Sequence, residues 1–404
     1  MKIPRPHRPV RSTVLAIAVG INLFVAMLTI LAAYGGTFNP DTRVIMAMIA
    51  MTFPAMLLLG MIVMTADLFF DRRLALIIAG GWLISIQPIL SFSPLHILGH
   101  SLSEQEKERS FTLLTYNILH YCDFRGENPE LEANATMSYI LSTDADIVNL
   151  QEAGPELTCP GRLNMMESGA VTTGDYWHMK QSQLDSLYAR YPYRVINRDN
   201  QLSVYSKYPV TPVRIHIPPK DHNVMECFRF DIKGQTVHLI NVHLKSIGLT
   251  DADKALYKQT FRNVPDSKQE LRSEISDVKS QLLSKLAVAF RDRAAQANTV
   301  KNVIDSIGGP FIVAGDFNDI PDCYAVRRIL SADGMNDAYA DAAFGPAITY
   351  HGDRFYFRID HVLYRGPFKA IDIERGGIYS SDHNPLLTTF LFDKDLRLQP
   401  ESAP

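Results

Sequence analysis

The sequence predicts an α/β sandwich preceded by three transmembrane helices. Long apolar stretches occur only in the first hundred residues, whereas short β-type runs separated by helical or loop stretches fill the remainder. The charge changes at the same place. Residues 1–103 contain 7 basic residues (Lys and Arg) and 3 acidic residues (Asp and Glu). Residues 104–404 contain 33 basic and 40 acidic residues, which gives a net charge of −7. The 404 residues also exceed the length of a typical single domain. We therefore expect two regions that fold in different surroundings.

Three apolar segments predict the membrane anchor, with helices at about 13–33, 44–64 and 74–90. The first two have the length that a helix needs to cross the hydrocarbon core of a bilayer. The third is shorter and contains Gln87 and Pro88. A buried core helix is the alternative, and it is better matched to the third segment than to the others. A cleaved signal peptide does not explain the pattern, because the first segment is long and two more follow it.

Basic residues predict how the anchor is oriented. They gather before the first apolar segment and between the second and third, at Lys2, Arg5, Arg8, Arg11, Arg72 and Arg73. Positive charge favours the cytoplasmic side, so the N-terminus is expected there. Three crossings then place the large domain on the outer face of the membrane. If the third segment does not cross, the large domain faces the cytoplasm.

The large domain is expected at 111–392, after an anchor at 1–95 and a polar linker at 96–110 and before a C-terminal tail at 393–404. Its longest helical candidate, 267–307, carries an apolar stripe at three- and four-residue spacing that indicates core packing. Several of its β-type runs end in, or carry, residues that can bind metal or phosphate. These are Asn117, Glu152, His243, Asp316, Asn318, Asp360, Asp382 and His383. This pattern predicts a site at one edge of the sheets.

The residue types at these positions support one kind of chemistry. Oxygen atoms of Asn117, Glu152 and Asp382 suit a hard cation such as Mg²⁺, and the four cysteines show no metal-binding spacing. A metal on a phosphoryl oxygen stabilises developing negative charge. Histidines and further carboxylates can activate water for attack on phosphorus. Each motif alone also fits a turn, a helix cap or an edge residue, because Gly, Asp and Asn are common turn formers.

The order of the motifs decides between these readings. TYN, QE, NVHL, GDFND, RIDHVL and SDHNP follow one another over roughly 111–392. In this order they resemble the endonuclease/exonuclease/phosphatase superfamily, the deoxyribonuclease-I-like fold. With the apolar segments in front, the chain is similar to a membrane-anchored bacterial branch of that superfamily. The resemblance implies a four-layer α/β sandwich of two packed mixed sheets flanked by helices, anchored in the bacterial inner membrane with its catalytic domain outside the cytoplasm.

The resemblance also implies a role for each residue. The metal site would consist of Glu152 as principal ligand with Asn117 and Asp382. The catalytic positions would be His243 at the scissile phosphate, Asp316 at the attacking water, Asn318 at the phosphate, His383 as phosphate stabiliser or general acid–base, and Asp360 as the carboxylate that orients His383.

The implied activity is hydrolysis of a phosphate ester with Mg²⁺, for which Mn²⁺ can substitute. A phosphodiesterase of the nuclease type is favoured, and a phospholipid or small-molecule phosphodiesterase or phosphatase is the alternative. A catalytically inactive, membrane-tethered binding protein is the competing class. The net charge of −7 weighs against tight non-specific DNA binding. The expected partners are the lipid bilayer and a phosphate-ester substrate; the sequence indicates no protein partner.

Two cysteines bear on whether the large domain lies outside the cytoplasm. Cys122 and Cys159 lie in the segments that follow Asn117 and Glu152, which resemble the ends of neighbouring strands. If the large domain is extracytoplasmic, we expect that these two cysteines form a disulfide.

Overall fold

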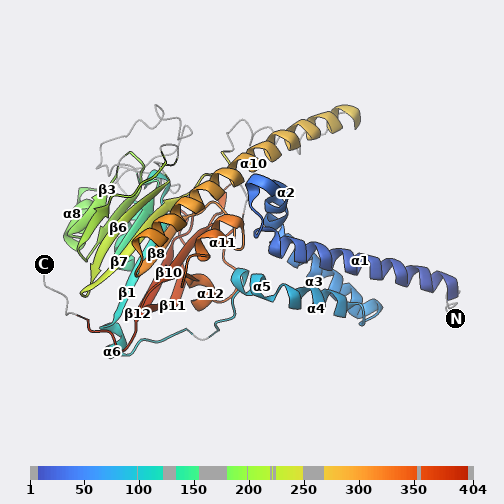
Figure 1. Cartoon of the computed structure of the whole chain (residues 1–404), viewed down its shortest axis with the longest axis horizontal. Helices are drawn as coiled ribbons and strands as arrows, with labels where there is room; N and C mark the ends of the chain where they lie inside the picture. The colour runs from blue at the N-terminus through green and yellow to red at the C-terminus, as the bar shows by residue number, and fades with distance from the viewer. Residues whose placement is uncertain are drawn as a thin grey trace. The chain divides into compact units, whose positions relative to one another are not determined.

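The computed structural model describes residues 8–97, 99–121, 133–153, 180–197, 199–218, 221, 224–248, 268–352 and 356–398. The described residues fall into two compact units, one containing the N-terminal helices and the other containing both β-sheets (Figure 1). Cys122 and Cys159 lie outside the described residues, so their expected disulfide stays a prediction. Cys227 and Cys323 are buried.

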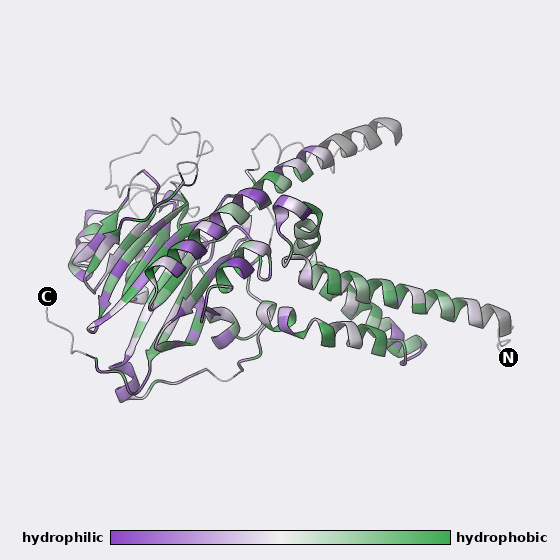
Figure 2. Cartoon of the chain, in the orientation of Figure 1, coloured by the Kyte–Doolittle hydropathy of each residue, from purple (hydrophilic) through white to green (hydrophobic). Residues whose placement is uncertain are grey.

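The N-terminal unit consists largely of apolar helices (Figure 2). Their bounds are α1 (Arg8–Gly35), α2 (Pro40–Met51), α3 (Phe53–Phe70), α4 (Ala75–Ile84) and α5 (Ile86–Phe92). Among the described residues, Ser12–Gly35 and Phe53–Phe70 are each long and apolar enough to cross a membrane. The α4–α5 pair adds a third such segment if the two bent helices count as one span.

The second apolar segment differs from the expected span of 44–64. The helix breaks at Thr52, so the segment is divided between α2 and α3, and the long apolar helix is Phe53–Phe70. Pro54, in the first turn of α3, explains the break, because it has no amide hydrogen to donate to the carbonyl four residues earlier. Hydropathy continues smoothly across this point, so the sequence pattern did not reveal it.

The third expected span, 74–90, is bent by 77° between α4 and α5. Pro88 lies four residues after Ile84 and cannot donate a hydrogen bond to the carbonyl of Ile84. The hydroxyl of Tyr34 donates to that carbonyl instead, at 2.6 Å. The bend therefore leaves the freed acceptor satisfied within the helical unit.

The second unit contains two six-stranded sheets. The first sheet has the order β11 (Phe368–Arg375), β12 (Leu386–Phe392), β1 (Ser110–Asn117), β2 (Ile147–Gln151), β4 (Ser203–Ser206), β3 (Tyr193–Ile196). The second has the order β5 (Val210–Val213), β6 (Met225–Ile232), β7 (Gln235–His243), β8 (Phe311–Asp316), β10 (Asp360–Arg365), β9 (Asn336–Asp337). Both are mixed, because β1 pairs with β2 and β7 with β8 in parallel, and the other pairs are antiparallel.

The sheets pack face to face, and helices cover their outer faces. Alternation along β1 sends Leu113 into the core between the sheets and Leu114 into a second core under α7 (Ala135–Thr143) and α8 (Gln181–Arg190). On the other sheet, Arg365 donates to the carbonyl of Ile304 near the end of α10 (Lys268–Ile307). Shorter helices are α6 (Glu104–Lys107), η1 (Leu119–Tyr121), α11 (Tyr324–Leu330) and α12 (Ala338–Ala342). The predicted α/β sandwich is confirmed.

Buried amide side chains join the two sheets near one edge of this core. Gln151 donates to the side chain of Asn241 at 2.7 Å, and Asn241 donates to the carbonyl of Leu150 at 2.9 Å. Asn149 donates to the carbonyl of Ala314 at 3.2 Å. Such bonds fix the spacing of β2 against β7 and β8, because breaking one leaves a buried polar group unpaired. The strands that carry the candidate site are therefore held in a defined geometry.

The expected linker at 96–110 is only partly a linker. Leu95 forms a β-bridge with Phe344, and the amide of His96 donates to the carbonyl of Ala343 at 3.2 Å. The helix α6 then occupies the middle of the polar segment. The chain thus joins the sheet-containing unit before β1 begins.

Candidate active site

Strand register brings the first group of candidate residues together. Asp316, at the end of β8, pairs with His243 at the end of β7 and with Asp360 at the start of β10. On the other sheet, Asn117 pairs with Gln151, so Glu152 directly follows the end of β2. The strand ends therefore deliver these side chains to one edge of the sandwich, as the sequence pattern predicted.

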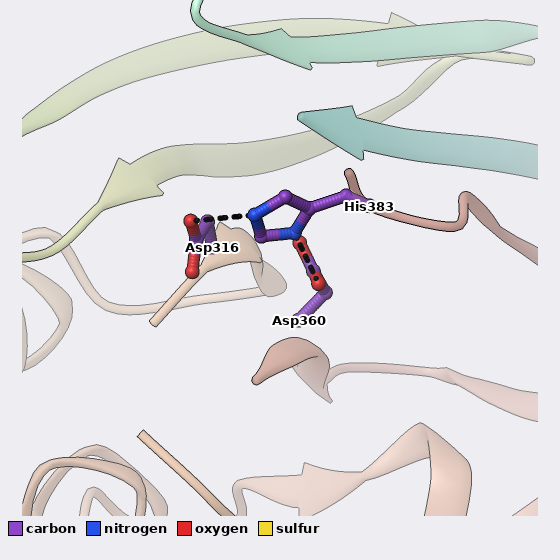
Figure 3. Close-up of side chains that lie close together, drawn as sticks. All are labelled: Asp316, Asp360 and His383. Atoms are coloured by element: carbon purple, nitrogen blue, oxygen red, sulfur yellow. Dashed lines mark hydrogen bonds and ion pairs between the residues drawn. The ribbon is translucent and has the colours of Figure 1, made fainter. Parts of the chain in front are cut away.

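Three buried side chains form a continuous acid–base chain at this edge (Figure 3). The Nδ1 atom of His383 lies 2.9 Å from Oδ2 of Asp360, and its Nε2 atom lies 3.6 Å from Oδ2 of Asp316. Each of the three residues is at most 4% exposed. The carboxylate of Asp360 fixes the orientation of the imidazole, so that Nε2 faces Asp316.

Burial and mutual charge shift the protonation of this chain. Burial lowers the pKa of His383, but the carboxylates of Asp360 and Asp316 outweigh it, and the pKa rises to about 10. Burial also raises the pKa of Asp316, against the opposing charge of His383. The imidazole of His383 is consequently an imidazolium at neutral pH, placed to stabilise negative charge.

The turn after β8 needs its glycine and its asparagine. A Cβ atom on Gly315 would lie 2.0 Å from the carbonyl oxygen of Val242, so only glycine allows β7 and β8 to approach here. Asn318 has a φ of 51°, in the left-handed region that asparagine tolerates better than most residues. Its amide N–H donates to Asp316 at 2.8 Å, and its side chain donates to the carbonyl of Leu244 at 3.0 Å. The GDFND motif thereby positions Asp316.

Glu152 is the centre of the second group. It has a φ of 50°, an uncommon conformation for a glutamate and one often found at functional sites. The side-chain amide of Asn117 donates to Glu152 at 3.2 Å and to Asp316 at 3.1 Å. The Nε2 atom of His243 lies 3.7 Å from Glu152 and 3.6 Å from Asp316. Asn117 and His243 therefore connect the two groups.

Asp382 completes the second group. Burial raises its pKa, and the nearby negative charge of Glu152 raises it further, against the effect of His383. Glu152 keeps a lowered pKa because His243 and His120 oppose the effect of burial. Two carboxylates in mutual repulsion are donors of the kind that bind a hard divalent cation. The side chain of Asn117 turns its nitrogen toward Glu152, and its oxygen accepts from the amide of Leu119. The two carboxylates are chemically suited to a hard divalent cation.

A different triplet is the tightest group of potential metal ligands among the described residues. Ligand atoms of Asp316, Asp360 and His383 all lie within 4.8 Å of one another. In this triplet, however, both imidazole nitrogens already face a carboxylate, and Nδ1 is hydrogen-bonded. A cation bound there would displace an existing bond, whereas one at Glu152 and Asp382 would relieve repulsion.

Sequence reasoning missed two residues of the site. The Nε2 atom of His120 lies 3.8 Å from Glu152, because Leu119, His120 and Tyr121 all have positive φ values and turn the chain back after β1. The ring of Tyr350 lies 5.0 Å from that of His383. His120 follows Asn117 by only three residues, and that proximity was the available signal. Nothing local distinguished Tyr350 from ordinary core aromatics.

Several solved structures are similar to this chain. A protein from Beutenbergia cavernae, titled endonuclease/exonuclease/phosphatase, is 16% identical with a TM-score of 0.42, and the match covers 70% of this chain and 72% of that one. Truncated TDP2 from Caenorhabditis elegans is 17% identical with a TM-score of 0.40, covering 70% and 98%. An endonuclease/exonuclease/phosphatase from Bacteroides vulgatus is 17% identical with a TM-score of 0.40, covering 70% and 99%.

Family models divide the chain where its composition changes. A model described as a domain of unknown function matches residues 14–92. No curated protein matches the chain significantly. The model described as the Endonuclease/Exonuclease/phosphatase family matches residues 114–383, about two thirds of the chain. The chain therefore belongs to the Endonuclease/Exonuclease/phosphatase family.

Proposed function

We propose that the chain is a membrane-anchored, Mg²⁺-dependent phosphodiesterase. The observation that carries the proposal is that two groups of side chains with different environments lie together at one edge of the sandwich. One group is the buried chain of Asp360, His383 and Asp316, and the other is the partly exposed pair of Glu152 and Asp382. A phosphoryl centre bound between them would meet a proton acceptor, a fixed positive charge and a metal site.

The side chains divide the work of hydrolysis. Asp316 accepts a proton as water attacks phosphorus, and the bond from phosphorus to the leaving oxygen breaks. The imidazolium of His383 stabilises the negative charge that develops on the phosphoryl oxygens, and Asp360 keeps it charged and oriented. His243 and Asn318 contact the same oxygens. The departing alkoxide takes a proton from solvent, and Asp316 returns its proton to solvent.

Glu152, Asp382 and Asn117 would hold the divalent cation. When bound, the cation polarises a phosphoryl oxygen and favours departure of the alkoxide. The choice of Mg²⁺ rests on the oxygen donors of these three residues, and Mn²⁺ accepts the same donors. His120 and His243 flank Glu152 and favour its ionised form.

Anchoring in a membrane is the second part of the proposal. It is supported by two helices of sufficient length and apolarity, with a third if α4 and α5 form one bent span. The basic residues before α1 and at Arg72 and Arg73 favour a cytoplasmic N-terminus in a bacterial inner membrane. With three crossings the catalytic domain, proposed at 111–392, lies outside the cytoplasm.

The test uses the full chain, solubilised from membranes and supplied with Mg²⁺. Bis(p-nitrophenyl) phosphate and p-nitrophenyl phosphate serve as diester and monoester, and EDTA removes the metal. We expect EDTA-sensitive hydrolysis that is faster for the diester, lost in His383→Ala and kept in His100→Ala. His100 is the matched control because its side chain is 43% exposed and pairs with Glu106 beside α6.

Three results would overturn the proposal. Absence of hydrolysis of either ester would leave an inactive binding protein. Preference for the monoester would make the chain a phosphatase. Equal activity with and without EDTA would remove the metal from the reaction.

A further inference from the structure

A cavity of about 450 Å³ lies beside the candidate site and takes no part in the chemistry described above. Its volume falls within the range of pockets that bind small molecules. Ala347, Ile348 and Ile373 contribute aliphatic surface to it, and Phe344, Tyr356 and Tyr379 contribute aromatic surface.

The cavity and the catalytic histidine share a wall. Tyr350 pairs in extended conformation with Phe357 and His383, so the side chains of Tyr350 and its neighbour His351 point to opposite sides. Tyr350 places its ring 5.0 Å from that of His383, whereas His351 lines the cavity. Asn384, directly after His383, lines it too. A molecule whose phosphate lies at His383 therefore has the cavity one side chain away.

Several large aromatic and aliphatic side chains at the rim of the cavity are exposed. Phe344, Tyr356 and Tyr379 are 61%, 58% and 70% exposed, and Ile348 is 42% exposed. Leu95, which pairs with Phe344, continues this surface at 64% exposure. Grouped, exposed apolar side chains mark binding surfaces, and aromatic residues are typical of the boundary between water and lipid.

One cation sits among these apolar groups. Arg375 lines the cavity and is exposed, and within the described part of the chain no carboxylate forms an ion pair with it. Among the described residues, its guanidinium donates one long hydrogen bond, 3.5 Å to the carbonyl of Gly376. The guanidinium at this cavity complements an anionic group of an amphiphile.

We infer that this cavity receives the hydrocarbon chain of a lipid phosphodiester while the phosphate lies at the candidate active site. The inference rests on the proposed function and names its substrate class. A nucleic acid is less well matched, because the residues from 104 onward carry a net charge of −7 and Ala347, Ile348 and Ile373 place aliphatic surface in the cavity. The apolar helices of the same chain would keep the domain close to such a substrate.

The test varies only the alkyl group of the substrate. The full chain, held in an amphipathic polymer without free detergent, receives methyl, butyl and octyl p-nitrophenyl phosphates and thymidine p-nitrophenyl phosphate. Burial of each methylene is expected to raise kcat/KM by up to about fourfold, so the octyl ester should exceed the methyl ester by at least about tenfold. Ile348→Asp places a charge on the rim and should reduce the octyl-to-methyl ratio severalfold.

Two further variants keep the test decisive. Ala347→Phe fills the cavity and should flatten the dependence on chain length in the same way. Val288→Asp changes a β-branched apolar residue on α10 that is 51% exposed, against 42% for Ile348, and should keep the wild-type ratio.

The outcomes separate the two proposals. No hydrolysis of any of the four esters would overturn the proposed function and the inference with it. Hydrolysis of all alkyl esters at one rate, or a dependence on chain length that both cavity variants retain, would overturn the inference alone. Preference for the thymidine ester, lost in Ile348→Asp, would assign the cavity to a nucleoside instead.

Discussion

At one end of the site, His383 lies between Asp360 and Asp316, all three are buried, and the imidazole faces a carboxylate on each side. At the other end, Glu152 and Asp382 raise the energy of each other's charged form, and the Glu152 side chain is 23% exposed. The first group is complete without a ligand, whereas the second gains from a cation. We therefore expect mutations in the first group to lower the catalytic rate and mutations in the second group to change the Mg²⁺ dependence.

The largest effect is expected when the buried group of Asp360, His383 and Asp316 loses its proton acceptor. Asp316→Asn should lower kcat on a diester by more than about 100-fold, because the attacking water then has no base. The Mg²⁺ concentration at half-maximal rate should stay near that of wild type. Steady-state kinetics across a Mg²⁺ titration measure both quantities, with Asp305→Asn, a partly exposed aspartate on α10, as the matched control. A rate within a few-fold of wild type would remove Asp316 from this role.

Glu152→Gln should weaken Mg²⁺ binding at the other group. The amide is neutral, so the metal site loses charge, and the Mg²⁺ needed for half-maximal rate should rise about tenfold or more. High Mg²⁺ should restore much of the rate. Glu104→Gln, whose carboxylate is 88% exposed in a surface ion pair, is the control. An unchanged titration would show that Glu152 is not a ligand.

A smaller, pH-dependent effect is expected from Asp360→Asn. The Asp360 carboxylate helps to raise the pKa of His383, so its loss should lower that pKa. If the charged imidazole is the active form, the alkaline limb of the pH–rate profile should move to lower pH. The acid limb follows the pKa of Asp316, which is raised to about 6, and loss of the neighbouring Asp360 charge should move that limb to lower pH as well. An alkaline limb at its wild-type position would contradict the proposed link.

The smallest effect should come from His120→Gln. The Nε2 atom of His120 lies 3.8 Å from a carboxylate oxygen of Glu152, so the interaction is electrostatic. Burial lowers the pKa of His120. We expect a change of a few-fold in the Mg²⁺ dependence and little change in the rate at saturating metal. Titration by the same kinetic assay measures it. A loss as large as that of Asp316→Asn would place His120 in the chemistry.

Sequence could predict the parts of this molecule that follow from strand ends and apolar length. Asp316 and Glu152 directly follow buried β-type runs, and register alone brings Asp316 beside His243. His120 was missed because three consecutive positive φ values have no clear signal in the residues LHY. The helix bounds in the second apolar segment differ from those expected, because hydropathy does not register the missing hydrogen bond at Pro54. Contacts made across long sequence separations, such as Tyr350 on His383, need the folded chain.

The most direct test of the account is a Mg²⁺ titration of diester hydrolysis, recorded side by side for the wild-type full chain, Glu152→Gln and Asp316→Asn. The account predicts that rising Mg²⁺ restores Glu152→Gln toward the wild-type rate and leaves Asp316→Asn inactive. Rescue of both variants, or of neither, would contradict the division of the site into a metal end and an acid–base end.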